Sequence, residues 1–295
     1  MRWSVTLGIG VLGLLVGGSA SAQNVHVKSW DEPVERCDQL DITYDDEPAA
    51  RSETQLTASL ADAPTLTANP LENGGVYVVG SDRADYAITV CKAARRAEPL
   101  ARIDVRIERG VISTQGPSGE RWLVYLLVKA PRRAAVVLET WNGPLMVAGL
   151  SGRVQARTTN GPIALRESSG SIDATAQNGP ISFSGQAGEV RLTAANGPID
   201  VRLTGDRWQH GSLTARGQNG PVSVRVAEDY QSGVRVESAN HSPWSCKGPS
   251  CGGGRKNWDD DSRSIELGSG PIAVRVSTVN GPVQISTGTH ASRKD

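Results

Sequence analysis

The sequence contains few large aromatic or flexible apolar residues. It has one Phe and two Met, whereas Gly occurs 33 times, and Val, Thr, Ser and Arg are abundant. A scarcity of bulky side chains disfavours thick cores and long helices. This composition is typical of short strands joined by frequent turns, with a thin core of Val, Ile, Leu and Ala.

The sequence also lacks a long apolar run. The longest, Val5–Val16, has about twelve residues, whereas a helix that spans a bilayer needs roughly twenty. It follows Met1-Arg2 and precedes Ala20-Ser21-Ala22, the pattern of a secretory signal peptide. The shortness of the run disfavours the alternative, an N-terminal membrane anchor. We predict a signal peptide over 1–22 and a mature chain without a transmembrane segment, located in the periplasm, on the cell surface or outside the cell.

An excess of charge of either sign is missing as well. The formal net charge is +0, which excludes a general attraction to nucleic acid or to anionic membranes. The charge is unevenly distributed, because the stretch before residue 100 is acidic and the following body is mildly basic through Arg. We interpret both regions mainly as solvated faces.

Cysteine is rare but even in number: Cys37, Cys91, Cys246 and Cys251. In an exported chain an even number predicts disulfides. Three pairings are possible. We favour Cys37 with Cys91 and Cys246 with Cys251, because each pair lies within one segment and the body between them has no cysteine. Loop closure would stabilise by about 4 kcal/mol for the long loop and about 2 kcal/mol for the short one.

The main feature is a repeated Asn-Gly-Pro followed by an apolar residue. The first four copies begin eighteen residues apart, and two further copies follow less regularly. A fixed period of this size indicates a repeat architecture. Asn240-His241-Ser242-Pro243 is a degenerate copy, and Asn73-Gly74-Gly75 is an early one. The six complete turns are Asn142-Gly143, Asn160-Gly161, Asn178-Gly179, Asn196-Gly197, Asn219-Gly220 and Asn280-Gly281.

Each turn precedes an alternating strand, such as Ile163 with Leu165, and a second alternating strand follows half a repeat later, such as Ile172 with Ala174. The unit is therefore two strands and two corners. An antiparallel meander would use Asn-Gly as a hairpin turn, but the Pro that follows has no N–H to donate across it. We therefore predict an all-β fold, a single parallel β-solenoid of about eighteen residues per coil, with the meander as the alternative. Asn and Gly tolerate the backbone conformation of a corner, so we interpret the motif as structural.

The expected organisation follows from these patterns. Residues 23–100 form a disulfide-clipped N-terminal β region or cap of the solenoid. Residues 101–288 form the solenoid, with a projecting loop inserted over 242–264, and 289–295 form a disordered tail.

These Asn-Gly-Pro-Ile repeats behind a signal peptide resemble the bacterial family of putative adhesins, a domain of unknown function built from β-strand repeats with Asn-Gly-Asp or Asn-Gly-Pro turns. The resemblance covers roughly 73–287 and is clearest over 141–226. It implies a β-solenoid-like fold and an extracytoplasmic location. It carries over no catalytic residue. Pro in place of the commoner Asp weakens any expectation that the turns bind cations.

Catalytic constellations are absent from the sequence pattern. There is no Gly-x-Ser-x-Gly elbow, and only four His are present. Glycosidase chemistry needs a pair of facing carboxylates, but the acids of the repeats fall at different positions in different coils. They are Glu139, Glu167, Asp173, Glu189 and Asp200. We expect no enzyme activity and no cofactor.

Two weak metal hypotheses remain. Asp259, Asp260 and Asp261 could gather calcium, but their spacing matches no defined calcium loop. His241, Cys246 and Cys251 could bind zinc, yet export favours a disulfide between the two cysteines.

Arg166, Arg202 and Arg225 share the sixth position after the repeat Asn and should point outward from one sheet. Guanidinium groups bind carboxylates and phosphates bidentately, so this row could hold an acidic glycan, or it could merely keep the face soluble. Trp244 and Trp258 add candidate contacts on the 242–264 loop. We interpret the chain as an exported, non-enzymatic, adhesin-like scaffold whose partner is an acidic glycan or an envelope protein. The alternative is a periplasmic carbohydrate-binding or carbohydrate-active β-helix protein.

Overall fold

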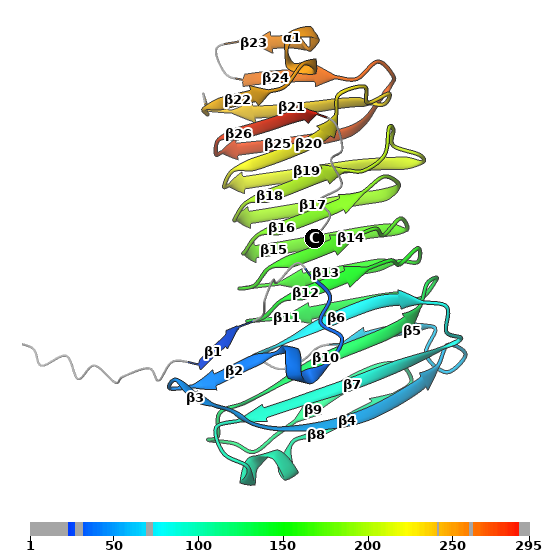
Figure 1. The fold of residues 1–295 in the computed structure, drawn as a ribbon, viewed down its shortest axis with the longest axis vertical. Coiled ribbons are helices and arrows are strands. Elements are labelled where there is room, and N and C mark those ends of the chain that lie inside the picture. The colour runs from blue at the N-terminus through cyan, green and yellow to red at the C-terminus, as the bar shows by residue number, and fades with distance from the viewer. Residues whose placement is uncertain (1–22, 27–31, 69–72, 241, 260–261, 289–295) are drawn as a thin grey trace, which may run out of the picture.

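The computed structural model describes residues 23–26, 32–68, 73–240, 242–259 and 262–288. The predicted signal peptide and C-terminal tail lie outside these residues. The described chain is mainly β-structure, with only short helical turns. Two long sheets face each other, and their strands stack along the long axis of the molecule (Figure 1). Most neighbouring strands are parallel, so the predicted β-solenoid is confirmed and the antiparallel meander is rejected.

The first sheet has eleven strands. In spatial order they are β22 (Trp244–Lys247), β26 (Val283–Gly288), β20 (Val222–Ala227), β18 (Ile199–Leu203), β16 (Ile181–Gly185), β14 (Ile163–Arg166), β12 (Leu145–Ala148), β6 (Gly74–Ser81), β10 (Trp122–Pro131), β7 (Asp85–Ala94) and β4 (Ala50–Ser59).

The second sheet has twelve strands. They are β23 (Arg255–Trp258), β24 (Ser262–Leu267), β21 (Gly233–Ala239), β25 (Ile272–Asn280), β19 (Gly211–Asn219), β17 (Gly188–Asn196), β15 (Ser171–Asn178), β13 (Val154–Thr158), β11 (Ala135–Thr140), β5 (Thr65–Ala68), β9 (Val111–Gln115) and β8 (Asp104–Glu108).

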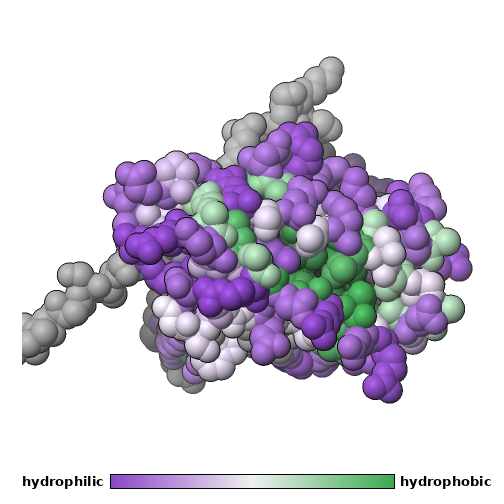
Figure 2. Space-filling model, turned by 90° about the horizontal axis from the view of Figure 1, so that it is seen from below, coloured by the Kyte–Doolittle hydropathy of each residue, from purple (hydrophilic) through white to green (hydrophobic). Residues whose placement is uncertain are grey.

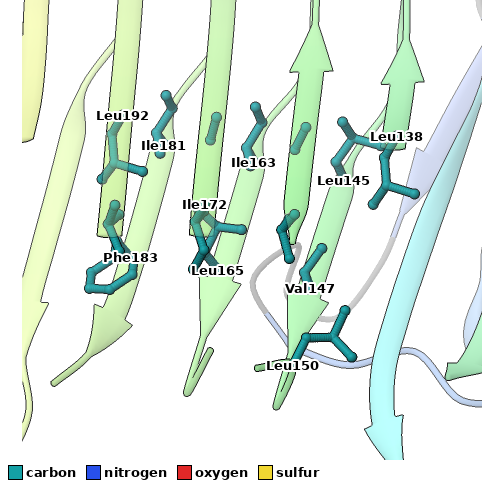
Figure 3. Packing of buried hydrophobic residues seen from close by; sticks show 14 of the residues in the cluster. Leu138, Leu145, Val147, Leu150, Ile163, Leu165, Ile172, Ile181, Phe183 and Leu192 are labelled. Atoms are coloured by element: carbon teal, nitrogen blue, oxygen red, sulfur yellow. The ribbon is translucent and has the colours of Figure 1, made fainter. Parts of the chain in front are cut away.

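The core is the thin apolar layer between these sheets. The period-two alternation turns every second side chain inward, and the constant register places equivalent residues above one another. Ile163 pairs with Ile181, which pairs with Ile199. From the facing sheet, Ile172 and Leu192 close the layer (Figure 3). All five side chains are buried, so each coil contributes a small, similar share of the core.

The corner residues also stack. From Asn142 onward, each corner Asn donates from Nδ2 to Oδ1 of the Asn in the preceding coil of the stack, at distances between 2.7 and 3.3 Å. The chain of amides runs through Asn73, Asn142, Asn160, Asn178, Asn196, Asn219, Asn280 and Asn240. The early copy at Asn73 and the degenerate copy at Asn240 are therefore true members of the repeat.

The order of the coils departs from the order of the sequence at both ends. The last coil, β25–β26, lies between the β19–β20 coil and the β21–β22 coil. Near the other end, the β5–β6 coil lies between β11–β12 and the β9–β10 pair. Simple sequence-order stacking holds only from β11 to β20. The identical registers permit these insertions, because an Asn corner fits equally well onto any other.

Antiparallel strands close both ends of the stack. β7 and β4 add to β10, and β8 adds to β9. At the opposite end β24 and β23 add to β21. The lower end, seen from below in Figure 2, shows an apolar area ringed by hydrophilic residues. Half-buried Leu56, Leu100 and Ile107 pack against the core at this end.

A second, smaller core lies on the outer face of the first sheet. There the N-terminal segment, with η1 (Cys37–Gln39), β2 (Asp41–Tyr44) and β3 (Glu47–Pro48), packs on the outward side chains of the lower strands. β1 (Gln23–His26) pairs with β2. Tyr44, Tyr77 and Tyr125 are buried in this layer. The segment thus covers a face of the solenoid in addition to the strands that close its end.

Segment 242–264 differs from the projecting loop expected from the sequence. It contains β22, the short helix α1 (Ser250–Gly253), β23 and the start of β24. β22 pairs with β26 in register, Trp244 opposite Val283. Most of the segment therefore continues the two sheets and covers the end of the core.

Candidate functional site

The outer face of the first sheet carries a column of cationic side chains. The register places Arg166 next to Ser184, Ser184 next to Arg202, and Arg202 next to Arg225. The column continues through Ser286 to Lys247. Neighbouring strands lie roughly 4.8 Å apart, so these charges form a straight row on a rigid backbone. We call Arg166, Arg202, Arg225 and Lys247 the cationic column.

Lys247 was missed by the sequence analysis. The corner Asn240-His241-Ser242-Pro243 has one residue more than Asn-Gly-Pro, so the sixth position after Asn240 is Cys246, which does not continue the row. The pairing of Lys247 with Ser286 restores the alignment one residue later. The extra residue in this corner shifts the register by one, and allowing for that shift would have predicted Lys247 as a member of the row.

The column is not uniformly cationic. Asp200 Oδ1 lies 2.6 Å from Arg225 Nη2, and this ion pair neutralises part of the positive charge. Arg166 is half-buried, whereas Arg202 and Lys247 are exposed. The row therefore offers three exposed cations, Arg202, Arg225 and Lys247, of which Arg225 is shared between Asp200 and solvent.

The two predicted Trp contacts behave differently. Trp244 faces inward opposite Val283, is half-buried against the core, and donates from Nε1 to Ser238 Oγ. It closes the end of the core. Trp258 is 58% exposed, and the guanidinium of Arg263 lies 5.2 Å from its ring centre. It belongs to β23 in the second sheet, so it does not lie on the same face as the cationic column.

Both disulfides have the pairing favoured from the sequence, Cys37 with Cys91 and Cys246 with Cys251. The first fixes η1 to β7, and the second fixes α1 to β22. Their positions are structural, because one holds the second core and the other holds the cover over the end of the main core.

The acids of the repeats are dispersed. Glu139 pairs with Arg157, Glu189 accepts from Ser212, and Asp200 pairs with Arg225. Glu167 accepts from Ser184, and Asp173 stands opposite Arg191. Asp200 projects from the first sheet, whereas Glu139, Asp173 and Glu189 belong to the second.

The structure does not bring the predicted metal ligands together within the described residues. Within the described residues no group of three or more His, Cys, Asp and Glu side chains could hold a metal ion. Asp259 accepts hydrogen bonds from the Ser262 backbone and hydroxyl, while Asp260 and Asp261 lie outside the described chain. No helix in the described part of the chain is long and apolar enough to cross a membrane.

A cleft that sequence reasoning did not identify lies on the outer face of the second sheet. Its volume is about 300 Å³, and Trp141, 64% exposed, stands beside it. The other residues that line it are Glu139, Thr140, Arg157, Thr158, Thr159, Thr175 and Gln177. The signal was present in the sequence, since Trp141 directly precedes a repeat Asn, where the other coils carry Thr159, Gln177, Ala195, Gln218 and Val279.

These features define the chain as a disulfide-stapled β-solenoid with polar outer faces. No family model matches it, and no curated protein matches it. Several solved structures resemble it, including the following two. One is a putative cell adhesion protein from Clostridium sporogenes, 10% identical, with a TM-score of 0.34 over 81% of this chain and 100% of that one.

The other is a putative adhesin from Bacteroides fragilis, 11% identical, with a TM-score of 0.28 over 80% of this chain and 97% of that one. A likeness this distant identifies neither a ligand nor an activity for the present chain.

Proposed function

We propose that this chain is a non-enzymatic, extracytoplasmic binding scaffold, adhesin-like, whose cationic column holds an acidic glycan. The observation that carries the proposal is the straight row of Arg166, Arg202, Arg225 and Lys247 on one rigid sheet face. A glycan with regularly spaced carboxylates or sulfates is itself a linear array of anions. Guanidinium groups pair with such anions bidentately, which gives the contact geometric specificity as well as charge.

Two further features support the proposal. The two disulfides fit an oxidising compartment outside the cytoplasm. The stacked Asn corners and the continuous core make the face rigid, so binding a stiff polymer costs little ordering entropy in the protein.

The experiment is retention of the protein Gln23–Asp295 on immobilised polygalacturonate and heparin. The variant Arg166→Gln/Arg202→Gln/Arg225→Gln/Lys247→Gln should lose at least about tenfold in affinity, and wild-type binding should weaken steeply with salt. Unchanged retention of the quadruple variant would refute the role of the column.

A matched control removes cations from the other sheet. Arg191, Arg216 and Arg275 are exposed on the second sheet, so Arg191→Gln/Arg216→Gln/Arg275→Gln lowers the net charge by a similar amount without touching the column. It should retain most of the affinity. An equal loss in this control would mean that bulk charge, and not the column, drives binding.

Release of new reducing ends from the polymers would contradict the non-enzymatic part of the proposal and favour a carbohydrate-active protein.

A further inference from the structure

The cleft beside Trp141 has the features of a second ligand site. We propose that it binds one uncharged pyranose unit of a glycan chain, with the sugar ring stacked on the indole of Trp141. This inference rests on the proposed glycan-binding function and names a second contact for it, on the opposite sheet from the cationic column.

Trp141 is placed unusually for so large an apolar side chain. It is 64% exposed, while most large apolar residues of this chain are buried. It stands at the end of β11, immediately before Asn142, and the next coil stacks beneath it: Asn160 N–H donates to the Trp141 carbonyl oxygen at 2.6 Å. The backbone under the indole is therefore fixed, and the ring projects as a wall at the corner of the coil.

The register creates the floor of the cleft. Glu139, Arg157 and Thr175 form one outward column across β11, β13 and β15. Trp141, Thr159 and Gln177 occupy the outward position two residues further along, beside the Asn corners. The two columns together span two inter-strand steps, roughly 10 Å. Small Thr side chains next to the large indole leave the space of about 300 Å³.

The charges in the cleft cancel. Arg157 Nη1 lies 3.5 Å from Glu139 Oε1. With the amide of Gln155 turned to present its oxygen, Gln155 accepts from Arg157 Nη1 at 3.0 Å and from Nη2 at 2.7 Å. The guanidinium is thus held by two neighbours, and the site has no net charge to attract an anion. This distinguishes it from the cationic column.

The remaining polar groups match sugar hydroxyls. Within the described chain, the hydroxyls of Thr159 and Thr175 and the amide of Gln177 make no side-chain hydrogen bond. They offer donors and acceptors on the same sheet face as the indole. The C–H face of a pyranose carries slight positive charge and packs on the negative face of an indole, while its hydroxyls project sideways. A pyranose ring therefore satisfies both parts of the cleft.

The test is isothermal titration calorimetry with four neutral oligosaccharides: cellohexaose, maltohexaose, xylohexaose and chitohexaose. We expect wild type to bind at least one of them with little salt dependence. Trp141→Ala should weaken that binding by about tenfold or more, whereas Trp258→Ala, which removes the other exposed Trp, should leave it within about twofold. Thr175→Val should also weaken binding, because it removes a hydroxyl from the cleft without opening space.

Other outcomes separate this inference from the proposed function. If none of the four neutral probes binds, or if Trp141→Ala binds as well as wild type, the Trp141 site is refuted, and retention on acidic glycans by the cationic column can still stand. If neutral probes bind through Trp141 while acidic retention is absent, the site stands and the cationic column is refuted. If neither class binds, both proposals are wrong.

Discussion

At the residue scale, the Asn and Gly of each corner perform separate tasks. The Asn amides link successive coils by hydrogen bonds, as between Asn178 and Asn160 at 2.9 Å. The Gly permits the coils to approach. A Cβ built at Gly179 would lie 2.0 Å from the carbonyl oxygen of Gly161. Gly is required at this position because there is no room for a side chain, and not because of its backbone conformation, since the φ of Gly179 is not in the left-handed region.

Substitution of Gly179 by Ala should therefore be costly. The methyl group forces the two coils apart, and overpacking of this kind costs about 1–3 kcal/mol. We expect a lower midpoint of urea unfolding for Gly179→Ala. The control is Gly252→Ala, since a Cβ there meets nothing within 4 Å and should leave stability almost unchanged. Equal midpoints for the two variants would show that adjacent coils can accommodate a methyl group at the corner without loss of stability.

A second prediction at this scale concerns alkaline pH. Burial raises the pKa of Tyr44 to about 12, against a smaller lowering by Arg121. In the unfolded chain the phenol titrates near pH ~10. The unfolded state loses this proton first, so the stabilising contribution is complete below about pH 10 and is lost as the pH rises through about 12.

We therefore expect the free energy of unfolding to fall across this interval, and to fall less steeply in Tyr44→Phe. Urea unfolding at a series of pH values measures both slopes. Burial also raises the pKa of Tyr77 and Tyr125, and the charge of ionised Tyr44 adds to the raised pKa of Tyr125. The difference between the two slopes therefore reports Tyr44 together with its effect on Tyr125. Identical slopes would show that Tyr44 ionises without opening the second core.

At the scale of elements, the N-terminal layer depends on a few attachments. The disulfide Cys37–Cys91 links η1 to β7. Asp45 Oδ2 forms ion pairs with Arg121 Nη2 at 2.6 Å and with Arg95 Nη2 at 3.2 Å. Hydrogen bonding to Arg121 lowers the pKa of the Asp45 carboxyl. The layer is short and covers only the lower strands of the first sheet, so its packing contacts are few. The Cys37–Cys91 disulfide supplies attachment that a larger packed interface would otherwise provide.

The two disulfides should differ in their effect on stability. Cys37–Cys91 closes a loop of sequence separation 54, and Cys246–Cys251 one of separation 5. Loop-closure entropy predicts losses of about 4 and about 2 kcal/mol on removal. We expect Cys37→Ser/Cys91→Ser to lower the urea midpoint more than Cys246→Ser/Cys251→Ser. The reverse order would mean that the cover of the upper end matters more than the entropy of the long loop.

At the scale of the whole molecule, the coil order can be tested by cross-linking. Ser223 pairs with Gln284 in the adjacent strand, whereas Ser245 pairs with Gln284 on its other side. We expect Ser223→Cys/Gln284→Cys to form a disulfide on oxidation, because adjacent strands lie within disulfide reach. Ser223→Cys/Ser245→Cys should not, since β26 separates the two positions. The opposite result would indicate stacking in sequence order.

Much of the architecture was predictable, because the sequence of each coil contains the local features that define its strands and corners. The period, the alternation and the Pro after Asn-Gly were enough to favour parallel coils over hairpins, and the disulfide pairings followed from the Cys positions. The cationic column was predicted in part, from the shared register of Arg166, Arg202 and Arg225. Lys247 and the Trp141 cleft were not, since each depends on which strands become neighbours.

The sequence by itself determined the coil: two strands, two corners, an Asn and a Gly where coils meet, and an apolar residue at every inward position. These are local requirements of backbone and packing. Only the tertiary structure decided the order of the coils at the two ends. Corners of the same kind fit one another in any order, so the repeat motif leaves open the insertion of β25–β26 between β19–β20 and β21–β22, which only the strand pairings of the folded chain show.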